Sequence, residues 1–278
     1  MSRVNRLIID VLIGIALLSM VVNLWLLPAW GRRVYRGERE TLLAELQPVA
    51  LKNCTMQRYG SPADGGYLMC ENLVGDLATA YSYGVGPNDD WGCDVSRRYH
   101  VPVHQYDCFD PARPSCEGGT FVFHDECIAD RREVSGSRVF DTLATQINRN
   151  GDTGKKMIVK IDVEGAEWPS LLATSDDVLQ GIDQLAMELH FVNDRHQIDR
   201  SGGRFLQLIR KLKQTFYLAN VHFNNQACTP ETAPLPAWAV QVLFVNKRLA
   251  VPDPSGTPAA TLSALNAPDW AGHPDCQH

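Results

Sequence analysis

The sequence predicts an α/β fold in which helices alternate with the strands of a largely parallel sheet. Short apolar runs rich in β-branched residues, such as 157–161, are followed by segments with helical periodicity. The turn Gly84-Val85-Gly86 follows one such run and precedes a polar helix, the order seen in the first unit of a nucleotide-binding α/β fold. Polar residues end several runs, as expected where strand ends face a crevice.

Seven segments have the length and composition of strands. They are residues 78–83, 101–109, 121–124, 157–161, 182–191, 216–223 and 239–246. Helices are expected at 38–49, 89–99, 139–150 and 203–214, and another after Glu167. The segment 54–70 contains Asp64-Gly65-Gly66-Tyr67, whose adjacent glycines predict either a tight hairpin or a close approach of backbone to a ligand.

Length and charge favour one membrane-anchored domain. The chain has 278 residues and a net charge of -6, which argues against a protein that coats nucleic acid, because phosphate binding needs a basic face. Residues 7–30 are mostly apolar, about the ~20 residues that a helix needs to cross a bilayer. We expect an anchor over 1–36, a stalk or first helix over 37–53, a catalytic domain over 54–249 and a Pro-rich, loosely ordered tail over 250–278.

Two observations disagree about the side of the membrane on which the domain lies. More arginines follow the apolar segment than precede it, which favours the cytoplasmic face. The eight cysteines are an even number and favour disulfides in an oxidising lumen of the secretory pathway. A Cys54–Cys70 bridge would favour the lumen.

Two neighbouring strands are expected to end in polar pairs. Asp162 and Glu164 follow the strand 157–161, and Glu188 and His190 end the strand 182–191. Residues two apart in a strand share a face, so Glu188 and His190 are predicted to act together. Glu164 has a second interpretation, as an acid that stabilises the start of the following helix.

Three segments resemble the FkbM-type family of S-adenosylmethionine-dependent methyltransferases. Residues 160–167, Lys-Ile-Asp-Val-Glu-Gly-Ala-Glu, are similar to its hallmark, and residues 187–190, Met-Glu-Leu-His, to its companion on the next strand. The Asp-Gly-Gly-Tyr turn in 58–70 resembles the branch of animal methyltransferase-like proteins. The resemblance covers about 54–247 and implies a Rossmann-like sheet of seven strands, six parallel and the last antiparallel, with helices on both faces.

The resemblance also implies a site for S-adenosylmethionine. It places cofactor contacts at Tyr83, Gly84 and Gly86, and at Asp110 after the second strand, with Asp107 as a further candidate. The family's acid two places before the first glycine is replaced by a serine here. We expect the turn Asp64-Gly65-Gly66 to supply the missing charge and a close backbone approach.

Methyl transfer to a hydroxyl needs a base or a metal ion, because an alcohol is too weakly acidic to react unaided. His190 is one candidate base, since the reference pKa of histidine is near 6.5, with Asp162 orienting it. Alternatively, Asp162 and Glu188 offer the oxygen ligands that a divalent ion such as magnesium prefers. The expected substrate is a hydroxyl group of a glycan or small molecule.

Two other functions are compatible with the same residues. A type II membrane-anchored glycosyltransferase could use Asp162-Val163-Glu164 as its metal site. A non-catalytic binding protein on a methyltransferase fold is consistent with the missing first-strand acid. The glycine turn and the helix that follows the acids favour the methyltransferase.

Overall fold

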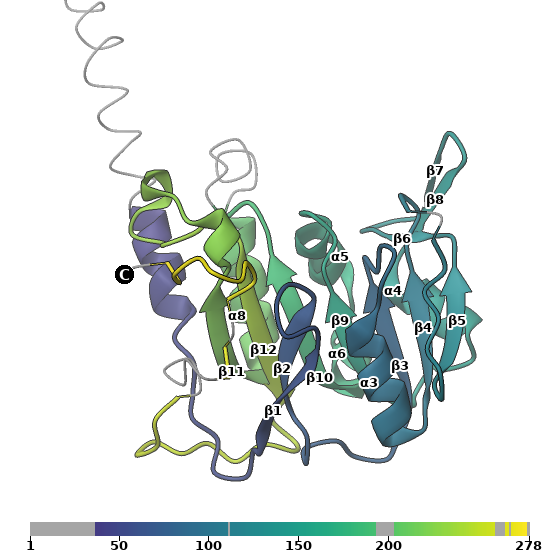
Figure 1. Ribbon diagram of the computed structural model, residues 1–278, viewed down its shortest axis with the longest axis horizontal. Helices are drawn as coiled ribbons and strands as arrows, with labels where there is room; N and C mark the ends of the chain where they lie inside the picture. Colours follow the sequence, from purple (N-terminus) through teal and green to yellow (C-terminus); the bar gives the residue numbers. More distant parts are fainter. Residues whose placement is uncertain (1–36, 111, 193–202, 259–264, 267, 277–278) are drawn as a thin grey trace, which may run out of the picture.

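A seven-stranded sheet forms the centre of the computed structural model, which describes residues 37–110, 112–192, 203–258, 265–266 and 268–276 (Figure 1). The order is β11-β12-β10-β9-β3-β4-β5. In that order the strands span Phe216–Phe223, Val240–Asn246, Ile182–Leu189, Lys156–Ile161, Leu77–Tyr83, Pro102–Tyr106 and Thr120–His124. Strand β12 pairs antiparallel with β10 and β11, while the other pairings are parallel. Six strands therefore run one way and β12 opposes them, as predicted.

Helices cover both faces of this sheet. They are residues 37–45, α3 (Asp90–Tyr99), α4 (Leu143–Arg149), α5 (Glu167–Ala173), α6 (Asp176–Gly181) and α8 (Arg204–Thr215), with short 3-10 turns η2 (Asn225–Ala227) and η3 (Pro230–Thr232). One buried cluster joins the sheet to residues 37–45, α4, α5, α6 and α8. The other cluster lies on the opposite face beneath α3 and the hairpin of β1 (Met56–Gly60) and β2 (Gly66–Cys70). The layered fold follows from strands that are apolar on both sides.

Two small sheets accompany the central one. Strands β1 (Met56–Gly60) and β2 (Gly66–Cys70) form an antiparallel hairpin, as the glycine-rich turn between them predicts. Strands β6 (Cys127–Ile128), β8 (Arg138–Asp141) and β7 (Glu133–Ser135) form a three-stranded sheet close to β4 and β5 (Figure 1). The predicted helix 139–150 is therefore wrong over its first residues: β8 occupies them, and Thr142 caps α4 by accepting from the amide of Thr145.

Four disulfides bridge all eight cysteines. They join Cys54 to Cys70, Cys93 to Cys116, Cys108 to Cys127, and Cys228 to Cys276. The first closes the β1–β2 hairpin, as the even cysteine count allowed. The last fastens the end of the chain beside η2.

Two described stretches of the Pro-rich tail pack against the domain. Residues 265–266 and 268–276, called the C-terminal strap below, pack against the edge formed by β11 and β12. Asn266 and Asp269 are buried, and the amides of Asn266 and Asn220 bond to each other. Buried polar contacts and a disulfide hold the strap, and the spacing of apolar residues in the sequence does not reveal such contacts.

Residues 37–46 belong to the domain, since Leu42 and Leu46 lie in its core. Of the two interpretations of 37–53, the first helix of the domain therefore applies. Among the described residues, no helix has the length and apolar character of a membrane span. The expected anchor over 1–36 lies outside the described residues.

Candidate functional site

A cavity of about 450 Å³ opens at the carboxyl ends of β3, β4 and β9. Its polar lining comes from Gly84, Gly86, Asp107, Asp162 and Glu164. Its apolar lining includes Tyr106, Phe109, Ile128, Val163 and Phe140. The cavity therefore lies where an open α/β sheet is expected to bind its ligand.

The glycine turn shapes one wall of the cavity. Gly84 has a φ of 69°, and a Cβ there would lie 1.7 Å from the carbonyl oxygen of Asp162. Gly86 has a φ of 53°, and no described atom lies within 4 Å of where its Cβ would be. Gly84 thus lets two strand ends approach, while Gly86 leaves room for a ligand against the backbone.

The acid at the end of the second strand is Asp107, and not Asp110. Strand β4 ends at Tyr106, so Asp107 follows it directly, lines the cavity and is 8% exposed. Its carboxylate accepts hydrogen bonds from the amides of Gly86, Phe109 and Asp110. Asp110 lies in the turn that Asp107 stabilises, where its own carboxylate accepts from the amide of Ala112. Strand β4 is thus shorter than predicted, and of these two acids Asp107 is the one that lines the cavity.

Four other predicted cofactor contacts lie away from the cavity lining. Tyr83 is fully buried in the core and stacks on Tyr106 at 4.9 Å between ring centroids. Asp64 is exposed in the β1–β2 turn, and Gly65 adopts a φ of 80° there. A Cβ on Gly66 would lie 2.0 Å from the carbonyl oxygen of Ser61, so this glycine serves the hairpin. The hairpin interpretation of this segment therefore applies.

The position of the missing first-strand acid has a structural explanation. Ser82 donates a hydrogen bond to Asp89 at 3.1 Å, and Gln105 donates to the same carboxylate at 2.8 Å. Asp89 also accepts from the amide of Gly92 and so caps α3. A buried acid is thus present, but it comes from the helix start and not from the strand.

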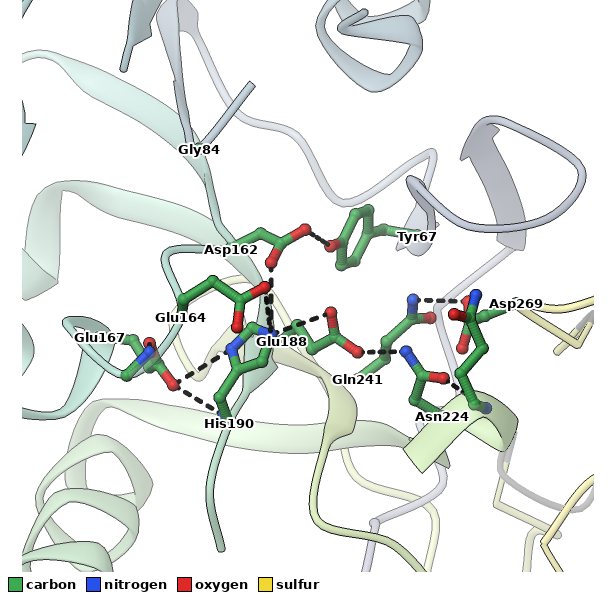
Figure 2. Close-up of polar contacts among 12 residues, drawn as sticks. Tyr67, Gly84, Asp162, Glu164, Glu167, Glu188, His190, Asn224, Gln241 and Asp269 are labelled. Atoms are coloured by element: carbon green, nitrogen blue, oxygen red, sulfur yellow. Dashed lines mark hydrogen bonds and ion pairs between the residues drawn. The ribbon is translucent and has the colours of Figure 1, made fainter. Parts of the chain in front are cut away.

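The four predicted catalytic residues do come together. Register pairs Ile161 of β9 with Tyr83 of β3 and with Met187 of β10. The residues that follow these three therefore meet at one edge of the sheet, and Asp162 and Glu188 become neighbours. Asp162, Glu164, Glu188 and His190 are called the acid cluster below (Figure 2).

His190 lies in the middle of the acid cluster and is 2% exposed. Its Nε2 is 3.3 Å from Glu188 Oε2, 3.6 Å from Asp162 Oδ1 and 3.7 Å from Glu164 Oε1. Its Nδ1 is 3.4 Å from Oε1 of Glu167. Four carboxylates thus surround a single imidazole (Figure 2).

This arrangement changes the protonation of His190. Burial alone would lower the pKa of the imidazole, but the contacts with Glu167 and Glu188 and their negative charges raise it to about 11. Without a bound cation the ring is therefore protonated at neutral pH, and a metal ion bound at Nε2 would replace that proton. His190 is therefore unsuited to act as the free base that its reference pKa suggested, because carboxylates stabilise its cationic form.

Glu167 lies in the first turn of α5 and is fully buried. One carboxylate oxygen accepts from the amide of His190 at 2.7 Å, and the other accepts from the amide of Gly165 at 2.7 Å. Glu167 thereby ties the β9–α5 turn, including Glu164 with its φ of 52°, to the end of β10. The sequence feature that could have identified Glu167 as a site residue is its position three residues after Glu164, in the first turn of a helix.

The outer oxygens of two cluster acids are held by further side chains. Tyr67 donates to Asp162 Oδ2 at 2.8 Å, and burial followed by the charge of Asp162 raises the pKa of Tyr67 well above its ordinary value. Lys160 lies 3.5 Å from the same oxygen. Asn224, which follows β11, donates to Glu188 Oε1 at 2.6 Å. Tyr67 belongs to the Asp-Gly-Gly-Tyr motif, whose tyrosine had no assigned role.

The C-terminal strap extends this polar region away from the cavity. Gln241 on β12 donates to Asp269 Oδ1 at 2.9 Å (Figure 2). The amide of Asp64 donates to the backbone oxygen of Asp269 at 3.1 Å. Asn225 donates to the backbone oxygens of Trp270 and His273. No pattern in the sequence linked residue 269 to the site.

Comparison of the chain with protein-family models, with curated proteins and with solved structures found no match. The geometry above is therefore the basis for the function proposed below.

Proposed function

We propose that this protein is an S-adenosylmethionine-dependent O-methyltransferase acting on a hydroxyl group of a glycan or small molecule. The observation that carries the proposal is that one cavity connects the glycine turn and Asp107 to Asp162 and Glu164. A cofactor held by the turn would thus lie next to carboxylates able to receive a hydroxyl substrate. The strand order, with one antiparallel strand between two parallel ones, supports the arrangement that the resemblance implies.

The residues around the cavity fit the cofactor. The volume of about 450 Å³ falls within the range of roughly 300 to 1,000 Å³ that ligand pockets show. Phe109, Ile128 and Phe140 offer an apolar surface for a purine, and Asp107 offers a carboxylate for ribose hydroxyls. The space at Gly86 allows a ligand to lie against the backbone. S-adenosylmethionine, when bound, supplies a methyl group on a positively charged sulfur.

The chain's own groups then position and activate the hydroxyl. Asp162 and Glu164 place negative charge at the edge of the cavity, which favours a cationic ligand beside them. Tyr67 and Lys160 fix the orientation of Asp162. The hydroxyl proton can pass to a carboxylate of the acid cluster, with His190 as the charge partner, or its loss can be aided by a divalent cation.

The disulfides support a location in an oxidising compartment. Bridges of this number are rare in reducing cytosol and common in secreted and lumenal proteins. We therefore place the domain on the lumenal side of the secretory pathway, with residues 7–30 as a single membrane anchor. Mass spectrometry of the non-reduced protein after thiol alkylation tests this: four or more labelled cysteines in protein from cells would contradict it.

Binding experiments test the function and separate it from the alternatives. Thermal shift and calorimetry should show binding of S-adenosylhomocysteine, and labelled methyl groups should be transferred to hydroxyl substrates. Stabilisation by a nucleotide sugar, without binding of S-adenosylhomocysteine, would favour the glycosyltransferase. Cofactor binding without transfer to any member of a hydroxyl-substrate panel would favour the binding protein.

A further inference from the structure

We infer that Asp162, Glu188 and His190 form a centre for one divalent transition-metal ion, which goes beyond the magnesium-type pair expected from sequence. One ligand atom from each residue lies within 4.8 Å of the others. The residues come from the ends of adjacent parallel strands β9 and β10, which the core holds rigidly in register. Bonds of about 2.1 Å would draw these atoms slightly closer, which small side-chain rotations allow.

The orientation of each ligand supports this centre. Asp162 has its Oδ2 held by Tyr67, and its Oδ1 faces His190. Glu188 has its Oε1 held by Asn224, and its Oε2 faces the same imidazole. In both acids the outer oxygen is occupied and the inner oxygen is directed at His190 Nε2 (Figure 2). Outer partners of this kind orient the ligands in metal sites.

His190 provides an observation independent of the acids. Its side chain is 3% exposed, and its Nδ1 makes no hydrogen bond within the described part of the chain. That Nδ1 lies 3.4 Å from Glu167, and its Nε2 points at the inner oxygens of Asp162 and Glu188. A carboxylate behind the imidazole is the common outer partner of a metal-bound histidine.

The donor set indicates the kind of ion. Carboxylates suit magnesium, calcium and manganese, whereas an imidazole suits zinc, copper, iron and nickel. Two carboxylates with one imidazole therefore favour Mn²⁺, Fe²⁺ or Zn²⁺ over Mg²⁺ or Ca²⁺. Glu164, whose side chain is 72% exposed, lies 3.7 Å from His190 Nε2 and can approach as a further ligand.

The centre has an open side towards the cavity, because Asp162 and Glu164 line it. Free coordination positions there would accept oxygens, so the substrate class that fits is a compound with two adjacent oxygens, such as a vicinal diol of a sugar. A hydroxyl bound to the ion loses its proton more readily, and a nearby carboxylate can accept it. This role rests on the proposed function, but metal binding itself does not.

The test uses the full chain after chelation and dialysis, titrated with MnCl₂ and ZnCl₂ in calorimetry without any cofactor. We expect one Mn²⁺ or Zn²⁺ per chain, and an Mn²⁺ affinity at least tenfold above that for Mg²⁺. Electron paramagnetic resonance of bound Mn²⁺ gives a second readout. Asp162→Asn and Glu188→Gln should weaken binding by about 100-fold, and Glu167→Gln by about 10-fold or more.

Asp107→Asn is the matched control, since it removes a cavity carboxylate outside the centre and should leave metal affinity unchanged. Thermal unfolding of each variant checks that it is folded. The inference is overturned if the wild-type chain binds no ion, or if the folded Asp162→Asn and Glu188→Gln variants bind as tightly as the wild type. Metal binding without binding of S-adenosylhomocysteine would refute the methyltransferase but keep the metal centre. Binding of S-adenosylhomocysteine without metal binding would refute the metal centre but keep the methyltransferase.

Discussion

The cavity beside β3 and β4 adjoins the acid cluster at the ends of β9 and β10, yet different kinds of interaction build the two regions. The cavity wall is mostly backbone and apolar side chains, with Gly84, Gly86 and Asp107 within 24 positions of one another. The acid cluster depends on charged side chains held by partners as distant in the chain as Tyr67 and Asn224.

This difference separates what each region requires. The cavity needs a backbone shape that only glycine allows, so a single added methyl group should damage it. The acid cluster needs charge balance, since its carboxylates are stabilised by His190, Lys160 and hydrogen bonds from neutral groups. Substitutions in the first region should therefore affect stability and cofactor affinity, while isosteric substitutions in the second should affect turnover.

The largest effect is expected from Asp162→Asn. The variant keeps the shape of the side chain but removes a charge that faces both the cavity and His190. We expect kcat for methyl transfer to fall by about 10³-fold, within the range for loss of a positioned catalytic group. The affinity for S-adenosylhomocysteine, measured by calorimetry, should change by less than about tenfold, because we expect Asp162 to stabilise the transition state and not the bound cofactor. Unchanged kcat would remove Asp162 from the mechanism.

Gly84→Ala should cause the next largest effect, on stability. The new Cβ would collide with the carbonyl oxygen of Asp162, and φ is 69°. We expect the free energy of unfolding in urea to fall by about 3 kcal/mol or more, as strain and overpacking add. At Gly86 the φ is also positive, but a Cβ would collide with nothing, so Gly86→Ala should lower the free energy of unfolding by only about 1 kcal/mol. Equal losses would show that close approach does not distinguish the two glycines.

The sequence predicted the sheet well because its signals are local. All seven strands of the central sheet were found from short apolar runs, and Asp162 and Glu188 lie at the carboxyl ends of β9 and β10 as predicted. The predicted end of β4 was three residues too late, so the acid that follows the strand and lines the cavity is Asp107 and not Asp110. Element boundaries are set by turn hydrogen bonds that apolar patterns do not report.

The rest of the site could not be predicted for a different reason. Asn224 contacts Glu188 because the order of strands in the sheet brings the end of β11 close to β10. Asp269 contacts Gln241 because a disulfide holds the C-terminal strap against the domain. Such contacts join residues many positions apart, and no spacing rule connects them. Glu167 was visible in the hallmark segment, but its burial depends on a contact with the amide of His190, which follows β10.

Asp107→Asn tests the cavity side with a matched control. Loss of the charge should weaken the hydrogen bonds that a ribose would make, and it should loosen the contact with the amide of Gly86. We expect the Kd for S-adenosylhomocysteine to rise by about 10- to 100-fold, corresponding to the ~1.5–3 kcal/mol of hydrogen bonds to a charged group. Asp110→Asn should leave the Kd within about twofold, since Asp110 only stabilises its own turn. The opposite ranking would restore Asp110 as the cofactor acid.

The smallest effect, in the strap, depends on pH. Burial, followed by the charges of Glu188 and Asp64, raises the pKa of Asp269 from 3.8 to about 7. Between pH 3.8 and about 7 the folded protein keeps a proton that the unfolded chain releases, so this residue makes the free energy of unfolding fall as pH rises through that window. Above pH 7 the buried carboxylate is charged, and Arg58 and Gln241 compensate it only in part.

Asp269→Asn should remove this dependence while keeping an oxygen that Gln241 can donate to. At pH 8 we expect the variant to be more stable than the wild type by at least about 1 kcal/mol in urea unfolding, and at pH 4 the two should be equal within error. Asp130→Asn, at an exposed position, should leave the pH profile unchanged. Parallel profiles for wild type and Asp269→Asn would mean that the carboxylate in the folded strap ionises as it does in water. The strap would then not share the charge-dependent character of the acid cluster.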